Sequence, residues 1–334
     1  MKKINKYLII TFFVNLVFCV DKTGTTAAKF LSIGVGSKAV GMGGAFTSVA
    51  NDATAMYWNP AGISFYNNKE IYFNHSNWIA DISFDYFGIT IPVGGRATMG
   101  MNITSVTMDE METTRYGNED TGETFKAADY AFGATYAMNL TDRFSLGLNG
   151  KYIQQTIANS HARGMALDLG TLFTTPFGFR LGTSISNFGQ KMMMTGDDLL
   201  VGADVDENID GNNESVTSVL TTDHFDLPLV LRIGVSDDIS IGSKNQIMWS
   251  IDAVSPNDNA NYVNAGGAVK ILDELITIHF GINSLLLDER EREFSFGFGL
   301  KFPANLIPGL RMHYAFETMK FLGDTQQVSL SFNY

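Results

Sequence analysis

Cysteine is almost absent from this chain of 334 residues, since Cys19 is the only one. A single thiol excludes an intrachain disulfide, and after export with removal of the N-terminus no Cys nucleophile would remain. Long apolar runs are also missing after residue 20, so no stretch reaches the length of a transmembrane helix. Neither disulfides nor membrane-spanning helices are therefore expected to hold this chain in place.

Basic residues are scarce, with 23 Lys and Arg against 35 Asp and Glu and a formal net charge of −12. Nucleic acid is excluded as a partner, because phosphate binding needs a basic surface. No G-x-S-x-G nucleophile motif occurs, and the histidines lack metal-ligand or catalytic spacing. These histidines are His75, His161, His224, His279 and His313. We expect no enzyme and no cofactor; a Ser–His pair on a lipid-facing surface, as in a barrel lipase, is the alternative.

Residues 1–20, MKKINKYLIITFFVNLVFCV, combine a basic start with an apolar run from Tyr7. This run is short for a bilayer span and is typical of a secretory signal peptide. Cleavage after Cys19 would place Val17 at the −3 position. A lipoprotein signal is the weaker interpretation, because Phe18 stands where a small residue is required. The chain is therefore expected to be exported.

Strict alternation of apolar and polar residues begins near residue 67. Within 129–140, Tyr130, Phe132, Tyr136 and Met138 share one face, whereas the other face is small and polar. Period two with one apolar face indicates strands, and a small polar opposite face favours a wet lumen over a second packed sheet, as in a soluble β-sandwich. Fourteen such segments occur, near 69–78, 82–93, 96–108, 126–140, 143–156, 164–174, 177–188, 226–236, 245–255, 260–271, 275–286, 291–301, 308–319 and 325–334. The sequence predicts an all-β fold, a transmembrane antiparallel β-barrel of about 14 strands over residues 67–334.

The connections alternate in length, which orients the predicted barrel. The short set is Gly94-Gly95, Thr141-Asp142, Pro176, Ser236–Lys244, Asp273-Glu274 and Pro303–Pro308, and the other set contains the long 109–125 and 191–225. Short connections are periplasmic in bacterial barrels, so both the N-terminal segment and the C-terminus are predicted on the periplasmic side. The last strand ends in outward-facing Leu330, Phe332 and Tyr334, which resembles the recognition signal for the barrel assembly machinery. Outer-membrane lipid and that machinery are thus expected partners.

Residues 21–66 precede the first strand and are rich in Gly and Ala. Asn51 or Asp52 can cap a short helix, and Pro60 should end it. An ordinary glycine-rich lead-in is one interpretation. The other is a hatch in the periplasmic half of the lumen, with Phe46, Tyr57 and Trp58 on the wall, because a barrel of 14 strands is too wide for its own side chains to fill.

Four charged residues are predicted to line the lumen: Lys151, Asp168, Arg180 and Asp252. They could set the polarity of a path, or pair with each other and hold the hatch; an unpaired buried carboxylate would be costly. Met192, Met193 and Met194 lie at the predicted outer mouth, where they could contact a hydrophobic ligand or a protein, or pack on their own loop.

Alternating oxygen donors at Asp206, Asn208 and Asp210 resemble the first half of a calcium loop. The EF-hand register has Thr217 where the closing Glu belongs. A solvated acidic loop that binds no calcium is therefore the alternative interpretation.

The stretch from Ser37 to Gly62 also carries a family resemblance. Met42-Gly43-Gly44-Ala45-Phe46, Asp52 and Trp58-Asn59-Pro60-Ala61-Gly62 resemble the N-terminal signature of PorV/PorQ-family outer-membrane proteins, relatives of FadL-type transporters. The resemblance implies that Gly43, Gly44, Phe46, Asp52, Trp58, Asn59, Pro60 and Gly62 belong to the hatch. It implies an adaptor or carrier role in type IX protein secretion, with secretion-system proteins or exported cargo as partners. The alternative is FadL-like passage of long-chain fatty acids or other small hydrophobic compounds.

Overall fold

The structure is a computed structural model of the chain. It describes residues 24–65, 69–117, 121–204, 216–287, 289–303 and 306–334. The predicted signal peptide and the candidate calcium ligands Asp206, Asn208 and Asp210 lie outside these ranges. None of the helices in the described residues has the length and apolarity needed to cross a membrane.

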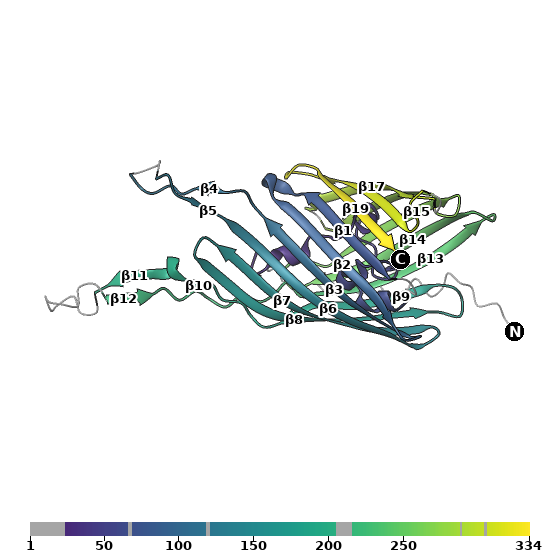
Figure 1. Cartoon of the computed structure of the whole chain (residues 1–334), viewed down its shortest axis with the longest axis horizontal. Helices are drawn as coiled ribbons and strands as arrows, with labels where there is room; N and C mark the ends of the chain where they lie inside the picture. Colours follow the sequence, from purple (N-terminus) through teal and green to yellow (C-terminus); the bar gives the residue numbers. More distant parts are fainter. Residues whose placement is uncertain (1–23, 66–68, 118–120, 205–215, 288, 304–305) are drawn as a thin grey trace.

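Fourteen antiparallel strands form the wall, each paired with its neighbours and closed by the pairing of β8 with β9 (Figure 1). Their bounds are β1 Glu70–Asn77, β2 Ser83–Val93, β3 Ala97–Thr107, β6 Ala127–Thr141, β7 Phe144–Ile157, β8 Ser160–Thr174, β9 Arg180–Gly189, β13 Val230–Ile241, β14 Asn245–Pro256, β15 Tyr262–Ile271, β16 Ile276–Leu285, β17 Arg292–Lys301, β18 Leu310–Met319 and β19 Thr325–Asn333. The first and last strands, β1 and β19, pair over their whole length. Closure leaves no free sheet edge, as a membrane barrel requires, and the predicted antiparallel barrel is confirmed.

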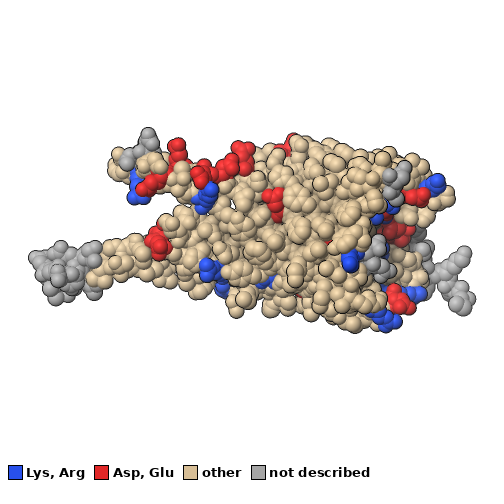
Figure 2. Space-filling view, in the orientation of Figure 1, with Lys and Arg blue, Asp and Glu red and all other residues tan. Residues whose placement is uncertain are grey.

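The two faces of each strand differ as the alternation predicts. Outward side chains are apolar and exposed, for example Phe132 at 46% and Met165 at 63%, whereas inward ones such as Thr135 and Asn149 are polar and buried. In Figure 2 the barrel wall carries few charges, and Lys, Arg, Asp and Glu gather toward the two ends. This arrangement presents an apolar belt to lipid.

The two ends of the barrel are unlike. At the terminal end, where β19 leaves the wall, strands are joined by short turns such as 94–96 and 142–143. At the opposite, long-loop end, two ribbons project in Figure 1: β4 Met111–Glu112 with β5 Thr124–Phe125, and β11 Leu200–Ala203 with β12 Val216–Val219. The connections expected to be loops thus contain strand pairs, and β10 Thr195–Gly196 adds a short pairing to β8.

Several predicted boundaries were wrong by three residues or more, including the start of β13, which is Val230 rather than 226. The connection placed at Ser236–Lys244 is mostly strand, because β13 continues to Ile241 in register with Asn245. Strand β8 begins at Ser160, four residues before the predicted start, and β9 begins at Arg180 rather than 177.

Residues 27–64, here called the inner segment, lie within the ring of strands (Figure 1, purple). They form η2 Lys29–Ser32, α1 Ser37–Gly41, α2 Ala55–Trp58 and most of η3 Pro60–Phe65. Thr26, just before it, bridges Asp226 at the long-loop end, whereas the carboxylate of Glu70, at the terminal end, accepts from the Ala53 N–H at 2.7 Å. The inner segment therefore crosses the lumen from one end to the other and is not confined to the terminal half.

Local details of the inner segment differ from the capping prediction. Thr54, not Asn51 or Asp52, precedes α2, and no side chain caps it. The Asp52 carboxylate instead binds the N–H and hydroxyl of Thr54, which closes a tight turn before the helix. The α-helix ends at Trp58 and Asn59 is extended, as a residue before proline should be; Pro60 then opens the 3-10 turn η3.

Candidate functional site

The barrel wall carries inward-facing glycines at several places where the backbone of the inner segment approaches it closely. A Cβ on Gly147 would lie 2.3 Å from the Ala61 nitrogen, and one on Gly170 would lie 2.1 Å from Asn59 Oδ1. The same holds for Gly182 against Thr47, Gly266 against Met42 and Gly281 against Gly43. These glycines belong to β7, β8, β9, β15 and β16, so the seat of the inner segment extends around much of the wall.

Glycines of the inner segment make equally close approaches to the wall and to other residues of the segment. Gly43 has φ +64°, a conformation that side-chain-bearing residues seldom adopt, and its Cβ would lie 2.7 Å from the Ile282 nitrogen. Gly44 also has positive φ, at +71°, and Gly62 packs so that a Cβ would come within 2.0 Å of the Ala50 carbonyl oxygen. The path of this segment depends on all three positions.

Two predicted lumen charges bind the backbone of the inner segment. Asp252 Oδ2 accepts hydrogen bonds from Phe46 N at 2.9 Å and Thr47 N at 2.8 Å. The Arg180 guanidinium donates to the carbonyl oxygen of Val49 at 3.1 Å. Charge-assisted bonds of this kind are stronger than neutral ones, so β14 and β9 hold the segment from the wall.

The Trp58-Asn59-Pro60 sequence forms a polar and aromatic anchor. Trp58 Nε1 donates to the Val35 carbonyl at 2.8 Å. Asn59 Nδ2 donates to Thr47 O at 2.8 Å within the segment and to Thr171 O at 3.0 Å in β8. Pro60 lies against Gly170, and the rings of Phe46 and Trp58 meet edge to face at 6.3 Å. One short sequence thus links two turns of the segment to each other and to the wall.

The other two lumen charges pair with each other. Lys151 Nζ lies 2.8 Å from Asp168 Oδ1, and that carboxylate also accepts from Asn149 Nδ2 at 2.9 Å and Asn187 N at 2.7 Å. Asn187 has positive φ, and the register of β8 and β9 shifts beside Asp168. The buried carboxylate is therefore satisfied and holds an irregular point of the wall.

Met192 does not lie open at the outer mouth. It is buried, exchanges two backbone hydrogen bonds of 2.9 Å with Phe225, and packs against Gly164 of β8. Met193 and Met194 are partly buried, and Met194 exchanges hydrogen bonds with Thr222 of its own connection. The arrangement is that of a loop packing on its own strands.

The side chains of the last strand alternate as predicted. Leu330, Phe332 and Tyr334 are exposed on the outside of the barrel, and the rings of Phe332 and Tyr334 stack at 6.0 Å. Ser329 and Ser331 are buried on the lumen side, where Ser329 binds the N–H of Ser37 at 2.9 Å.

Several anchors were missed from the sequence. The Arg232 guanidinium lies 5.8 Å from the ring centre of Tyr57 and 5.4 Å from that of Trp58. Glu70 holds the Ala53 N–H, and Gln327 Nε2 donates to Gly34 O at 3.1 Å. The available signal was their lumen-side register in alternating strands, together with strand glycines on the same side.

In the described part of the chain, no group of three or more His, Cys, Asp and Glu side chains could hold a metal ion. What the site can do chemically is bind: it fixes a folded peptide segment across a lumen.

A closed antiparallel barrel with an apolar belt and a packed inner segment defines an integral β-barrel protein of the outer-membrane type. Residues 20–196, just over half of the chain, match the family model described as Type IX secretion system protein PorV. The chain therefore belongs to the PorV family, whose members are secretion proteins rather than enzymes, and this confirms the resemblance in its N-terminal sequence.

Solved structures with the same fold are distant in sequence. The toluene transporter TodX of Pseudomonas putida has a TM-score of 0.57 at 11% identity, over 90% of this chain and 99% of that one. A FadL homologue of Pseudomonas aeruginosa has a TM-score of 0.54 at 13% identity, over 90% of this chain and 98% of that one. The toluene transporter TbuX of Ralstonia pickettii has a TM-score of 0.56 at 12% identity, over 90% of this chain and 97% of that one. These similarities establish a FadL-like fold. No curated protein matches the chain.

Proposed function

We propose that this protein is an adaptor or carrier of type IX secretion, whose barrel is kept closed by the inner segment as a hatch. The observation that carries the proposal is the seat of wall glycines, which fits the backbone of residues 42–61 so closely that even a methyl group at these positions would collide. A segment fixed in this way suits a barrel that presents surfaces to other proteins better than one that conducts solutes.

In this proposal the terminal end, with its short turns and the hatch-to-β1 junction, faces the periplasm. The long-loop end faces outward, as long connections do in bacterial barrels. The ribbon of β11 and β12 would then project from the cell surface. Val219 and Leu220, at its base, are 63% and 54% exposed, and Val216, nearer its tip, is 42% exposed. Exposed apolar groups on a projecting ribbon support contact with another protein.

A secretion assay in the bacterium that encodes the chain tests this function. Cells without the protein should retain exported cargo in the periplasm, and the parent gene should restore its release. A photo-crosslinker at Val219 should capture a secretion-system protein or cargo, whereas one at Phe177, 74% exposed in a terminal-end turn, should not. Undiminished secretion in the deletion strain would contradict the proposal.

The second candidate is passage of small hydrophobic compounds. It is favoured by one observation: Phe30, Leu31, Met192 and Leu227 belong to a continuous buried apolar cluster that reaches the long-loop end. Uptake of toluene into proteoliposomes separates the two functions. The adaptor role predicts no uptake above empty vesicles, and a hatch-gated transporter predicts uptake that a disulfide-locked hatch abolishes.

A further inference from the structure

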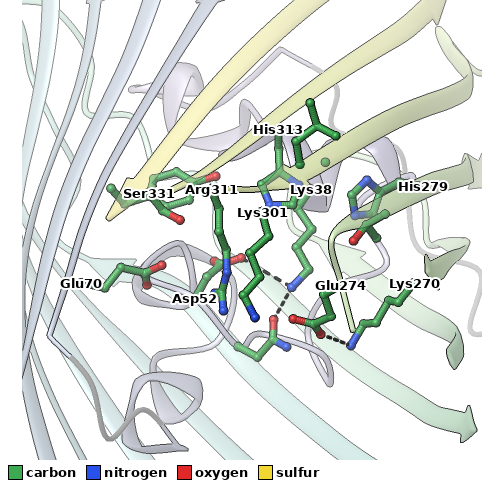
Figure 3. Close-up of a pocket in the computed structure, with 15 residues that line it drawn as sticks. Lys38, Asp52, Glu70, Lys270, Glu274, His279, Lys301, Arg311, His313 and Ser331 are labelled. Carbon is green, nitrogen blue, oxygen red and sulfur yellow. Dashed lines mark hydrogen bonds and ion pairs between the residues drawn. The ribbon is translucent and has the colours of Figure 1, made fainter. Parts of the chain in front are cut away.

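A cavity of about 190 Å³ opens at the terminal end between the inner segment and the strands β15 to β19. Four cations line it: Lys38 of α1, Lys270 of β15, Lys301 of β17 and Arg311 of β18. Figure 3 shows the ends of Lys38, Lys301 and Arg311 directed toward the same space. This volume has room for several water molecules, so a small polar ligand fits.

Lys301 and Arg311 stand directly opposite each other in the register of β17 and β18. Cross-strand neighbours of this kind have Cβ atoms about 4.5–5.5 Å apart, and like charges in such a pair are destabilising. A sheet that keeps two cations opposed gains stability when an anion lies between them.

Most of the nearby carboxylate oxygens are engaged elsewhere; Oε1 of Glu70 is the one that lacks a hydrogen-bond partner within the described ranges. Glu274 lies 2.8 Å from Lys270, Glu70 Oε2 accepts from the Ala53 N–H, and Asp52 binds Thr54 and lies 3.9 Å from Lys38. Among the residues that the structure describes, neither Lys301 nor Arg311 has an ion-pair partner within 4.0 Å. Two of the four cations are therefore available to a ligand.

Neutral groups deeper in the cavity are also without partners. His279 is completely buried, and both its ring nitrogens lack a hydrogen-bond partner within the described ranges. The same holds for Nδ1 of His313, whose ring lies 5.4 Å from that of His279. Buried polar atoms are seldom left without a partner, so these ring nitrogens can accommodate a water molecule or a polar ligand.

We propose that this cavity binds a small oxyanion, a phosphate or a carboxylate. The planar guanidinium of Arg311 suits two oxygens of such a group, Lys301 supplies a second charge, and an N–H of His279 faces the cavity from behind. This site does not depend on the secretion role, and it faces the interior of the barrel, away from lipid.

The test uses the full chain in detergent, with thermal unfolding followed by tryptophan fluorescence at constant ionic strength. Inorganic phosphate should raise the melting temperature of the parent saturably, beyond the effect of chloride. In Arg311→Gln and in Lys301→Gln, the phosphate concentration that gives half of the maximal rise in melting temperature should be higher by about tenfold or more, as expected for loss of a charge-assisted bond. Arg143→Gln, at an exposed position in another turn of the same end, should behave like the parent.

In buffer without oxyanions, both Gln variants should melt at or above the parent temperature, because the repulsion across the strands is relieved. A parallel titration with acetate identifies the source: saturation by acetate alone assigns a carboxylate ligand, and saturation by phosphate alone assigns phosphate. The proposal is overturned if neither oxyanion stabilises the parent more than chloride, or if Arg311→Gln and Arg143→Gln respond alike. Heat-modifiable gel mobility verifies that each variant is a folded barrel.

Discussion

Single glycines decide how closely the inner segment can approach the wall. Gly147 and Gly150 lie in the same strand on opposite faces: a Cβ on Gly147 would meet the Ala61 nitrogen at 2.3 Å, whereas one on Gly150 would meet nothing within 4 Å. Gly147→Val should therefore destabilise the seated segment by about 1–3 kcal/mol, as overpacking does. We expect trypsin to cleave after Lys38, which is partly buried, faster in this variant.

Gly150→Val is the matched control, because it adds the same side chain to the lipid side of β7. Equal trypsin sensitivity of the two variants would mean that the side chain acts through the strand and not through contact with the inner segment.

Protonation of Glu274, at the terminal end, should change the melting temperature of the protein. Burial raises the pKa of Glu274, but the Lys270 ammonium at 2.8 Å lowers it further, to about 2, against an ordinary value of 4.5. Because the folded-state pKa is depressed, the pairing stabilises the protein above pH 4.5 and its contribution disappears as the pH falls toward 2.

Melting temperatures of the parent and of Glu274→Gln should therefore converge between these pH values. A difference that stays constant over this range would show that the carboxylate charge contributes nothing. The side chain of Glu274 is 41% exposed, so salt should reduce the difference as well.

Among the elements, the closing strand β19 separates a lipid face from a lumen face within two residues. Phe332→Asp places a charge in the apolar belt, which costs up to a few kcal/mol at the membrane midplane and less near the interface. We expect a sharply lower yield of heat-modifiable barrel, since an assembly signal is altered too. Ser331→Asp, on the buried lumen side, should be much milder, and equal losses would contradict the facing of this strand.

The wall was predictable because each strand shows its two faces in its own sequence. The predicted strand boundaries were wrong where the alternation of apolar and polar residues ends. Asp237 and Asp238 look like a turn, yet they pair with Trp249 and Met248 in β14. The role of the wall glycines could not be predicted either, because it depends on contacts outside their own strands. In a strand, Gly170 only indicates a small lumen residue, and its reason for being glycine, the Asn59-Pro60 turn, lies more than a hundred residues away.

The candidate site was predictable in part. Trp58, Asn59 and Pro60 stood out through family resemblance, and Asp252 through its register, but which wall group meets which turn depends on barrel closure. The ribbons β4–β5 and β11–β12 and the short helix α1 were missed, because brief strand pairs and a five-residue helix leave no periodicity to detect.

As a whole, the molecule is a wide barrel whose interior is filled by its own N-terminal sequence. An eight-stranded wall is about the largest that its own side chains can fill, and this wall has fourteen strands. We therefore expect the barrel to be closed by residues 27–64, and the secretion role that we propose depends on that closed state.

Conductance across a planar lipid bilayer tests this claim most directly. The full chain should show no steady current, whereas a chain without residues 27–62 that still migrates as a folded barrel should conduct continuously. Trp58→Ala and Asn59→Ala should give intermediate leakage, because each removes one anchor and leaves the others. A folded deletion barrel that conducts no more than the full chain would contradict the account.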